Sequence, residues 1–266
     1  MKEKIAILGG GNIGKAIAKG LLASGKFPAK NLVVTDLNLA YLEDLKADGI
    51  AVTKDNIKAV RSSEIVILCV QPTQVNDLIA EIKDAIDPDK QIVAFVIAAY
   101  EVNDIRELIG KAVNVVRVMP NTAIAIRESM TCLSTHEGGD SALEKIKAIF
   151  DNLGTTMVIR EKLMGAATIL GACGIAYFLR FIRAASQGGI QVGFHADEAQ
   201  LIAAQTARGA ASLLLQTGNH PEDEIDKVTT PRGCTIAGLN EMEHFGLSSA
   251  VIKGIITSYN EIEKLK

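Results

Sequence analysis

Short apolar runs alternate with helix-like stretches along the first 160 residues of the chain. Most of these runs are unbroken rather than alternating, which is typical of strands covered on both faces in a parallel sheet. Strands are predicted at residues 4–8, 32–35, 65–70, 91–97, 114–118 and 131–134, with a later edge strand at 156–159. Helices are predicted between them, at 13–24, 40–48, 75–86, 103–109 and 141–152. This alternation implies right-handed βαβ crossovers and an α/β fold.

The pattern changes after about residue 160. Helices are predicted at 166–187, 196–216, 236–244 and 248–265, with no convincing strand among them. Small residues are dense in this half, for example at Ala203-Ala204 and Gly209-Ala210-Ala211, and small residues let helix axes approach closely. We therefore expect an α/β domain over residues 1–160 and an all-α C-terminal dimerisation domain over 161–266, which interlocks with a second copy of the chain.

Residues 163–179 form a stretch of seventeen residues without a charged side chain. A membrane span needs about 20 predominantly apolar residues. Here Arg180 and Arg183 follow at once, and three glycines interrupt the apolar run. The pattern favours a helix buried on all sides, inside a domain or in a subunit interface, over a transmembrane helix. We expect no membrane partner.

Composition narrows the class of protein further. The chain has 266 residues, of which 48% are hydrophobic, and its net charge is −3, with no stretch basic enough to predict nucleic acid as a partner. The four cysteines, Cys69, Cys132, Cys173 and Cys234, are scattered without a C-x-x-C pair. This spacing argues against a disulfide framework and against a metal site, and it favours a reducing, cytoplasmic location. The apolar stretch at 5–8 is too short for a signal peptide.

A glycine-rich motif follows the first predicted strand and opens the first predicted helix. It reads Gly9-Gly10-Gly11-Asn12-Ile13-Gly14, which is the G-x-G-x-x-G pattern. In this pattern Gly9 permits a tight turn, Gly11 lets the backbone approach a pyrophosphate, and Gly14 lets the helix pack on the strand. The anion then lies on free N–H groups at the helix N-terminus. The first domain is therefore predicted to be a Rossmann dinucleotide-binding domain.

Asp36 ends the second predicted strand, 22 residues after Gly14. An acid at about this distance accepts hydrogen bonds from the ribose hydroxyls of the adenosine. It also repels a 2′-phosphate, and no arginine follows it. The position favours NAD over NADP. The alternative is that Asp36 is a solvated turn residue.

Several longer motifs accompany the glycine loop. They lie at residues 7–17, at 70–72 (V-Q-P), at 117–122 (R-V-M-P-N-T), at 128–131, at 217–221 and at 228–239 (V-T-T-P-R-G-C-T-I-A-G-L). With these motifs the chain resembles, nearly end to end, the pyrroline-5-carboxylate reductase family, whose members reduce a cyclic imine acid to proline. The 117–122 and 228–239 segments are much more specific than the glycine loop.

The resemblance implies a Rossmann domain, a helical domain that forms an intertwined homodimer, often assembled further, and NADPH or NADH as the hydride donor. Cofactor contacts are then expected from Gly9, Gly11, Asn12, Ile13, Gly14, Asn56, Val70, Gln71, Pro72, Ala98 and Ala99. Substrate contacts are expected from Asn121 and from the 230–235 segment, which includes Thr230, Gly233 and Cys234.

The expected chemistry needs no strong acid. A cyclic imine has a pKa near neutrality and can arrive protonated, so hydride transfer depends on an anion site for its carboxylate and on placement beside the nicotinamide. The 229–235 loop precedes a predicted helix, whose N–H groups can hold a carboxylate. The Thr235 hydroxyl is the candidate for a hydrogen bond to the ring nitrogen; the alternative is that Thr235 is only an N-cap. The four histidines lie in loop or helix-edge positions, where structural roles are favoured.

The chain departs from the family pattern around the expected pocket. The family usually has Lys, Gly, Pro, Pro, Gly and Thr where this sequence has Gln71, Tyr100, Ala123, Ile175, Arg232 and Cys234. We interpret these changes as a reshaped substrate pocket in which Arg232 holds a carboxylate. The alternative is that Arg232 points to solvent.

Three functions are compatible with these residues. The leading one is reduction of 1-pyrroline-5-carboxylate to L-proline in proline biosynthesis. A second keeps the scaffold and cofactor but reduces another imine or keto acid. The third is a non-catalytic nucleotide-binding paralogue, which ranks last because the glycine loop, Asn121 and Thr235 are present.

Overall fold

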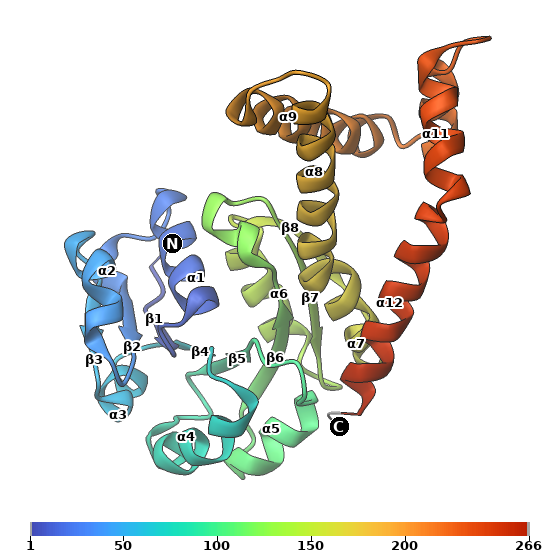
Figure 1. The fold of residues 1–266 in the computed structure, drawn as a ribbon. Helices are drawn as coiled ribbons and strands as arrows, with labels where there is room; N and C mark the ends of the chain where they lie inside the picture. The colour runs from blue at the N-terminus through green and yellow to red at the C-terminus, as the bar shows by residue number, and fades with distance from the viewer. Residues whose placement is uncertain (1, 265–266) are drawn as a thin grey trace. The chain divides into compact units, whose positions relative to one another are not determined.

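The computed structural model describes residues 2–264 and separates the chain into two compact units. The first unit runs from the N-terminal region to Cys173 and also includes the chain from Tyr259 onward, and the second covers Gly174–Ser258. The first is an α/β unit and the second is built of helices (Figure 1). The predicted fold class is thereby confirmed. The proposed division into domains at residues 160 and 161 stays a prediction.

A twisted eight-stranded sheet forms the centre of the first unit, with the strand order β3-β2-β1-β4-β5-β6-β7-β8 among the described residues. The strands are β1 (Ile5–Leu8), β2 (Leu32–Thr35), β3 (Ala51–Thr53), β4 (Ile65–Leu68), β5 (Ile92–Phe95), β6 (Asn114–Met119), β7 (Ser129–Thr135) and β8 (Gly154–Val158). Leu8 pairs with Thr35 on one side and with Leu68 on the other, so three strands end level. The strand order reverses between β1 and β4, and such switch points are where open α/β sheets bind ligands.

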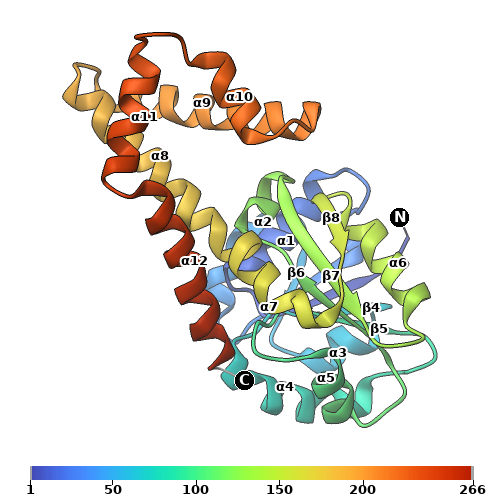
Figure 2. The same cartoon turned by 90° about the vertical axis from the view of Figure 1, so that its right-hand side faces the viewer.

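Helices cover both faces of this sheet (Figures 1 and 2). They are α1 (Asn12–Ala23), α2 (Glu43–Ala47), α3 (Asn56–Arg61), α4 (Val75–Ile82), α5 (Val102–Ile109) and α6 (Asp140–Phe150). One core joins α1, α2 and α6 to strand residues such as Ile5 and Ile7, and the other joins α3, α4 and α5 to Ala6 and Leu8. Successive residues of a strand face opposite cores. Residues on both faces of the sheet must therefore be apolar, which explains the unbroken apolar runs in the sequence.

Two features of the sheet differ from the predictions. β3 and α3 were not predicted, because three and six residues are too short to show a periodic pattern. β7 is antiparallel to β6, although a parallel sheet was expected. Only residues 120–128 connect these two strands, and a parallel crossover needs about a dozen residues or more. The short connection therefore forces β7 to turn back.

The C-terminal part of the chain is helical, as predicted. Its elements are α7 (Met164–Ala167), a π-helical segment (Thr168–Cys173), α8 (Gly174–Gln191), α9 (Ala196–Thr217), α10 (Pro221–Val228), α11 (Cys234–His244) and α12 (Leu247–Glu263). α10 was not predicted because its sequence, PEDEIDKV, is short and mostly polar. Its remaining signals are the proline at the first helical position and acids in the first turn.

The apolar 163–179 stretch lies in a continuous helical run, Glu161–Gln191, that is long and apolar enough to cross a membrane by length and composition alone. Within the most apolar 18-residue stretch of this run, only 22% is buried in the single chain. Leu170 and Phe178 are 63% and 68% exposed. The expectation of burial within its own domain is therefore wrong for the single chain, and burial in a subunit interface is the alternative that remains.

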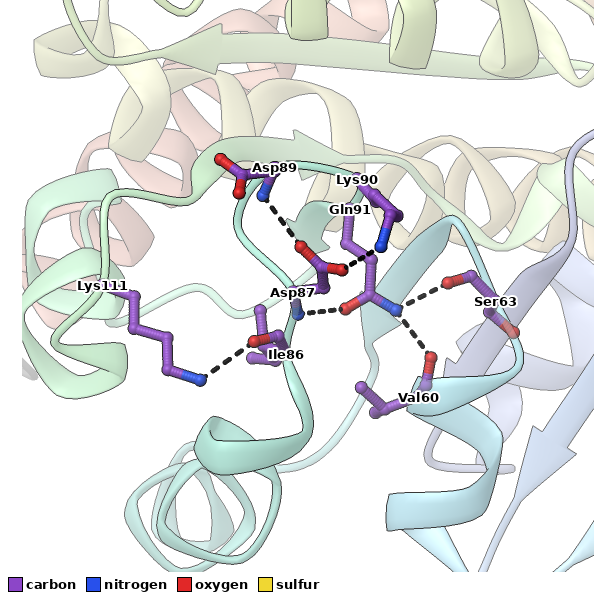
Figure 3. A network of polar contacts seen from close by, with 8 residues as sticks. All are labelled: Val60, Ser63, Ile86, Asp87, Asp89, Lys90, Gln91 and Lys111. Carbon is purple, nitrogen blue, oxygen red and sulfur yellow. Dashed lines mark hydrogen bonds and ion pairs between the residues drawn. The ribbon is translucent and has the colours of Figure 1, made fainter.

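A buried glutamine ties the amino end of β5 to its neighbours (Figure 3). The Gln91 Nε2 donates to the carbonyl oxygens of Val60 and Ser63 at 2.7 and 2.6 Å, and its Oε1 accepts from the Asp87 N–H at 2.9 Å. Gln91 is only 5% exposed. The Ser63 carbonyl and the Asp87 N–H would lose this partner if the side chain were removed, whereas the Val60 carbonyl would keep the Ser63 N–H at 3.1 Å.

We expect Gln91→Ala to lower the free energy of unfolding by about 3 kcal/mol, because the Ser63 carbonyl and the Asp87 N–H both lose their hydrogen-bond partner. Urea unfolding followed by circular dichroism measures this. The matched control is Lys90→Ala, which removes the exposed pair with Asp87 and should leave the midpoint unchanged. Equal midpoints for both variants would contradict the role given to Gln91.

Candidate functional site

The glycine loop joins β1 to α1 at the level carboxyl ends of β1, β2 and β4. Gly9 has a φ of +108°, and a Cβ added there would lie 2.5 Å from the Cys69 carbonyl oxygen. A Cβ at Gly14 would lie 1.9 Å from the Gly9 carbonyl oxygen. Both glycines are therefore required by close backbone packing. A Cβ at Gly11 would meet no described atom within 4 Å, so this side of the loop is open.

The open side of the loop is the N-terminus of α1. Gly11 is the N-cap residue, and within the described chain no side chain caps the helix and no acid lies in its first turn. The amides of Asn12, Ile13 and Gly14 are therefore left for an external acceptor. We call this open space at Gly11, next to the free amides of α1, the glycine cradle. A side chain at Gly11 would fill it. Such a space at an uncapped helix N-terminus suits the pyrophosphate of a dinucleotide.

The Asp36 carboxylate connects this loop to the end of β2. Its Oδ2 accepts from the Gly10 N–H at 2.9 Å, and its Oδ1 accepts from the Asn38 N–H at 2.8 Å. These bonds hold the carboxylate in a fixed position, and it is not simply a solvated turn residue. It lines a pocket of about 530 Å³ together with Gly9, Gly11, Asn56, Val70 and Gln71. The structure thus brings six of the predicted cofactor residues to one cavity.

Asn56 lies at the same wall of the pocket with both ends of its amide engaged. Its Oδ1 accepts from the Thr35 hydroxyl at 2.6 Å, and its Nδ2 donates to Glu81 Oε2 at 2.9 Å. Glu81 belongs to the region of α4 that lines the pocket, and Asp77 lines it too. Glu81 was not predicted, because nothing in the sequence marks one surface acid of an amphipathic helix among several.

The 39–42 turn forms another part of the pocket rim. Tyr41 lines the pocket and is 65% exposed. The Lys15 Nζ donates to the Tyr41 carbonyl oxygen at 2.7 Å and pairs with Asp44 at 2.8 Å. Hydrogen bonds from Lys15 and Lys19 hold the pKa of the Asp44 carboxyl well below its usual range. Lys15 therefore links the glycine-motif helix to this rim.

Cys69 also lines the pocket, but its contribution comes from the backbone. Burial raises the pKa of the Cys69 thiol to about 12, so the sulfur stays protonated at neutral pH. A thiol in this state is a poor nucleophile. Cys69 limits the space available to Gly9 through its carbonyl oxygen.

Two further loops follow β4 and β5 at the same edge of the sheet. Gln71 caps the short turn Pro72–Gln74, and Ala98 and Ala99 follow β5. The Tyr100 hydroxyl lies 3.5 Å from the Pro72 carbonyl oxygen and 3.4 Å from Asn76 Oδ1. Tyr100, where the family has glycine, therefore bridges the two loops with long, weak hydrogen bonds.

Asn121 holds local structure together. Its N–H donates to Ser129 Oγ at 3.1 Å, its Oδ1 accepts from the Ala123 N–H at 3.0 Å, and its Nδ2 donates to the Gly171 carbonyl oxygen at 3.0 Å. The side chain is 8% exposed. Gly171 belongs to the π-helical segment, a geometry often found at functional sites. A substrate contact from Asn121 stays a prediction, and its polar atoms already have partners.

The predicted substrate loop lies in the helical unit. The Gly233 N–H donates to the Thr230 carbonyl oxygen at 2.8 Å, which closes a turn around Pro231 and Arg232. Arg232 has a φ of +60°, a value that favours glycine, the residue usual in the family. Its side chain is exposed.

Gly233 is the N-cap of α11 and Thr235 is the second helical residue. The alternative that Thr235 is only an N-cap is therefore wrong. Cys234, the first residue of α11, is exposed. In the described chain no side chain caps this helix and its first turn holds no acid, so its amides are left for an anion. Ile175, in place of the family proline, lies in α8 just after the π-helical segment.

The histidines have structural positions. His195 and His220 are the N-cap residues of α9 and α10, and His244 packs edge-on against Phe245 at 5.6 Å. Within residues 2–264 no group of three or more histidine, cysteine or acidic side chains is arranged to hold a metal ion.

These features define a class: an oxidoreductase with a dinucleotide groove at the switch point of a Rossmann sheet and a helical C-terminal unit. Family models support each part. Residues 4–112 match the model described as NADP oxidoreductase, coenzyme F420-dependent, and residues 161–265 match that of pyrroline-5-carboxylate reductase dimerisation. The chain is 44% identical to pyrroline-5-carboxylate reductase 2 of Dictyostelium discoideum, over 98% of its own length and 93% of that relative's. The chain therefore belongs to the pyrroline-5-carboxylate reductase family.

Other relatives agree. Pyrroline-5-carboxylate reductase 1 of D. discoideum is 51% identical over 98% of the chain, which spans only 49% of that relative's length. The enzyme of Methanosarcina acetivorans is 32% identical over 99% of the chain and 98% of its own length.

Solved structures give the same fold. A pyrroline-5-carboxylate reductase of Coxiella burnetii has a TM-score of 0.89 at 28% identity, with 100% and 99% of the two chains covered. The pyrroline carboxylate reductase of Plasmodium falciparum, with NADP bound, has a TM-score of 0.90 at 21% identity, with 100% and 99% covered. The predictions of the family and of an oxidoreductase with a nicotinamide cofactor are confirmed.

We expect Gly11→Ala to fold normally but to bind NADH at least about tenfold more weakly, because the added methyl group enters the open cradle. A tenfold rise in Kd corresponds to a loss of about 1.4 kcal/mol of binding free energy. Titration of NADH fluorescence measures this. Gly14→Ala is the contrasting variant, since its Cβ meets the Gly9 carbonyl oxygen and should lower stability by about 2 kcal/mol. Tight NADH binding by Gly11→Ala would contradict the assignment of the cradle.

Proposed function

We propose that this chain reduces 1-pyrroline-5-carboxylate to L-proline with NADH as the preferred hydride donor. The single observation that carries the proposal is the groove at the ends of β1, β2 and β4, where an open glycine cradle lies beside a fixed carboxylate. Family membership supports the imine substrate. The free cysteines are compatible with a soluble enzyme in a reducing cytoplasm.

The residues have separate tasks in this proposal. The amides of Asn12, Ile13 and Gly14 hold the pyrophosphate, and the Asp36 carboxylate accepts from the ribose hydroxyls. The bound dihydronicotinamide supplies the hydride. In the helical unit, the amides at the start of α11 and the Arg232 guanidinium hold the substrate carboxylate. The Thr235 hydroxyl oxygen accepts from the protonated ring nitrogen and orients the imine carbon.

The charges around the pocket support NADH over NADPH. Asp36, Asp77 and Glu81 all line the cavity. Glu81 also accepts from the Asn56 amide, which is then less free to meet a phosphate. A 2′-phosphate would carry about two negative charges into this wall, and juxtaposed like charges cost several kcal/mol. Lys54 is the opposing cation among the lining residues.

We expect wild-type kcat/KM to be at least about tenfold higher with NADH than with NADPH. Charge repulsion of only about 1.4 kcal/mol between the 2′-phosphate and these acids would produce a tenfold difference. Asp36→Ser and Glu81→Gln should each raise kcat/KM for NADPH and reduce this ratio. Initial rates with 1-pyrroline-5-carboxylate and both dinucleotides measure it. Glu107→Gln, an exposed acid on α5, is the matched control.

Three outcomes would each contradict a different part of these proposals. A preference for NADPH that Lys54→Gln abolishes would overturn the NADH assignment. Turnover of another imine or keto acid, but not of 1-pyrroline-5-carboxylate, would overturn the substrate. Dinucleotide binding without any turnover would favour a non-catalytic paralogue.

Arg232 offers a separate test of the substrate loop. Arg232→Ala should raise the KM for 1-pyrroline-5-carboxylate without changing that for NADH. Arg232→Gly should have the same effect and also stabilise the chain by about 1 kcal/mol, because glycine accepts the left-handed backbone without strain.

Arg127→Gly is the matched control, because Arg127 has a φ of +61° in the first unit, outside the substrate loop. It should stabilise the chain and leave both KM values unchanged. Equal changes in the two KM values of Arg232→Ala, or none, would favour the alternative that Arg232 points to solvent.

Self-association follows from the dimerisation model that matches residues 161–265. We propose that the dimer is intertwined, because apolar side chains along α8, α9 and α12 are exposed in the single chain; they include Phe178, Phe181, Leu201, Leu215, Ile252 and Ile256. Exposed apolar surface of this extent marks an interface. We also propose that dimers assemble further.

A further inference from the structure

Arg117 is a charged residue inside an otherwise apolar strand. β6 reads NVVRVM, and the Arg117 side chain is 2% exposed. In the sheet register Arg117 pairs with Phe95 of β5 and with Ser134 of β7, so the three form one row across the sheet. Its guanidinium carbon lies 5.9 Å from the centre of the Phe95 ring. Burial of a guanidinium costs several kcal/mol unless strong partners repay it.

The partners of Arg117 lead to the loop after β5. Its Nη1 pairs with Glu161 Oε1 at 2.8 Å, and its Nη2 donates to the Ala98 carbonyl oxygen at 2.6 Å. The Nε is buried and finds no hydrogen-bond partner among the described residues. The pair is therefore incompletely satisfied, and similar buried pairs are often replaced by apolar residues without loss of stability. Stability alone does not account for this arginine.

Glu161 holds the other end of the same loop. Its Oε1 accepts from the Val102 N–H at 3.3 Å, and its Oε2 accepts from the Ser134 hydroxyl. The Arg117–Glu161 pair thus fixes the Ala98 carbonyl at one end of the loop and the Val102 amide at the other. Between them lie Ala99 and Tyr100, and Tyr100 contacts the neighbouring Pro72 loop.

We infer that the Arg117–Glu161 pair is a positioning device that fixes the Ala98–Val102 backbone against the nicotinamide half of the dinucleotide. This inference rests on the proposed function and on the expectation, implied by the family resemblance, that Ala98 and Ala99 contact the cofactor. Arg117 and Glu161 are positioning residues, because they act through the loop backbone. The adenosine half depends instead on the glycine cradle, Asp36 and Asn56, none of which contacts this pair.

Two dinucleotide probes separate positioning from general stability. The variant combines Arg117→Met with Glu161→Met, which removes both charges and keeps apolar volume. ADP-ribose, which lacks the nicotinamide ring, should bind with a Kd within about twofold of wild type, while the Kd for NADH rises about tenfold, a difference of about 1.4 kcal/mol. The kcat for imine reduction should fall more than the KM for the imine rises. Isothermal titration and initial rates measure these quantities.

Further variants keep the test decisive. Ser134→Ala removes one hydrogen bond to Glu161, and should shift the NADH-to-ADP-ribose ratio of Kd values in the same direction by a smaller amount, even if the double variant does not fold. Lys147→Met, which breaks an exposed pair with Asp151, should leave the ratio unchanged.

An unchanged ratio in the double variant would overturn the inference. If the double variant does not fold, an unchanged ratio in Ser134→Ala would overturn it. So would equal weakening of both ligands. Absence of turnover in the wild type would count against the proposed function alone, because the binding ratio needs no substrate.

Discussion

The structure depends on one close approach, between the backbone that leaves β1 and the backbone that leaves β4. The two strands end level, so the chain after Leu8 must cross directly over the Cys69 carbonyl oxygen and then turn into α1 against its own Gly9 carbonyl. A side chain at Gly9 or Gly14 leaves no room for this path. Because the path is so tight, the first amides of α1 lie at the switch point of the sheet, where the strand order reverses. The pocket, its carboxylate and the loops that follow β4 and β5 are all arranged around that point.

Much of this arrangement could be predicted from the sequence, since it rests on patterns that few folds share. The unbroken apolar runs marked the central strands because both faces of the sheet are covered. The G-x-G-x-x-G spacing and Asp36 marked the cofactor groove, and six predicted residues line it. The longer 117–122 and 228–239 segments identified the family. Helix-edge positions for the histidines were also predicted correctly, for example at His195 and His220.

What could not be predicted depends on three-dimensional partners. β3 is too short to show periodicity, and α10 is short with few apolar residues. The direction of β7 follows from the length of a connection. Asn121 was expected at the substrate, yet each of its side-chain polar atoms has a partner in the chain. Glu81 and Glu161 resemble any surface acid in the sequence. Their importance becomes visible only when Asn56 and Arg117 are found beside them.

The half-buried Cys69 beside the glycine loop has a consequence for thiol reactivity. Because burial raises its pKa, a smaller fraction of this thiol is ionised at neutral pH than of an ordinary thiol. Peroxides and electrophiles react with the thiolate, so this sulfur resists them while the sheet is closed. The chain can therefore carry a cysteine beside its glycine loop that reacts more slowly with oxidants than an ordinary surface thiol.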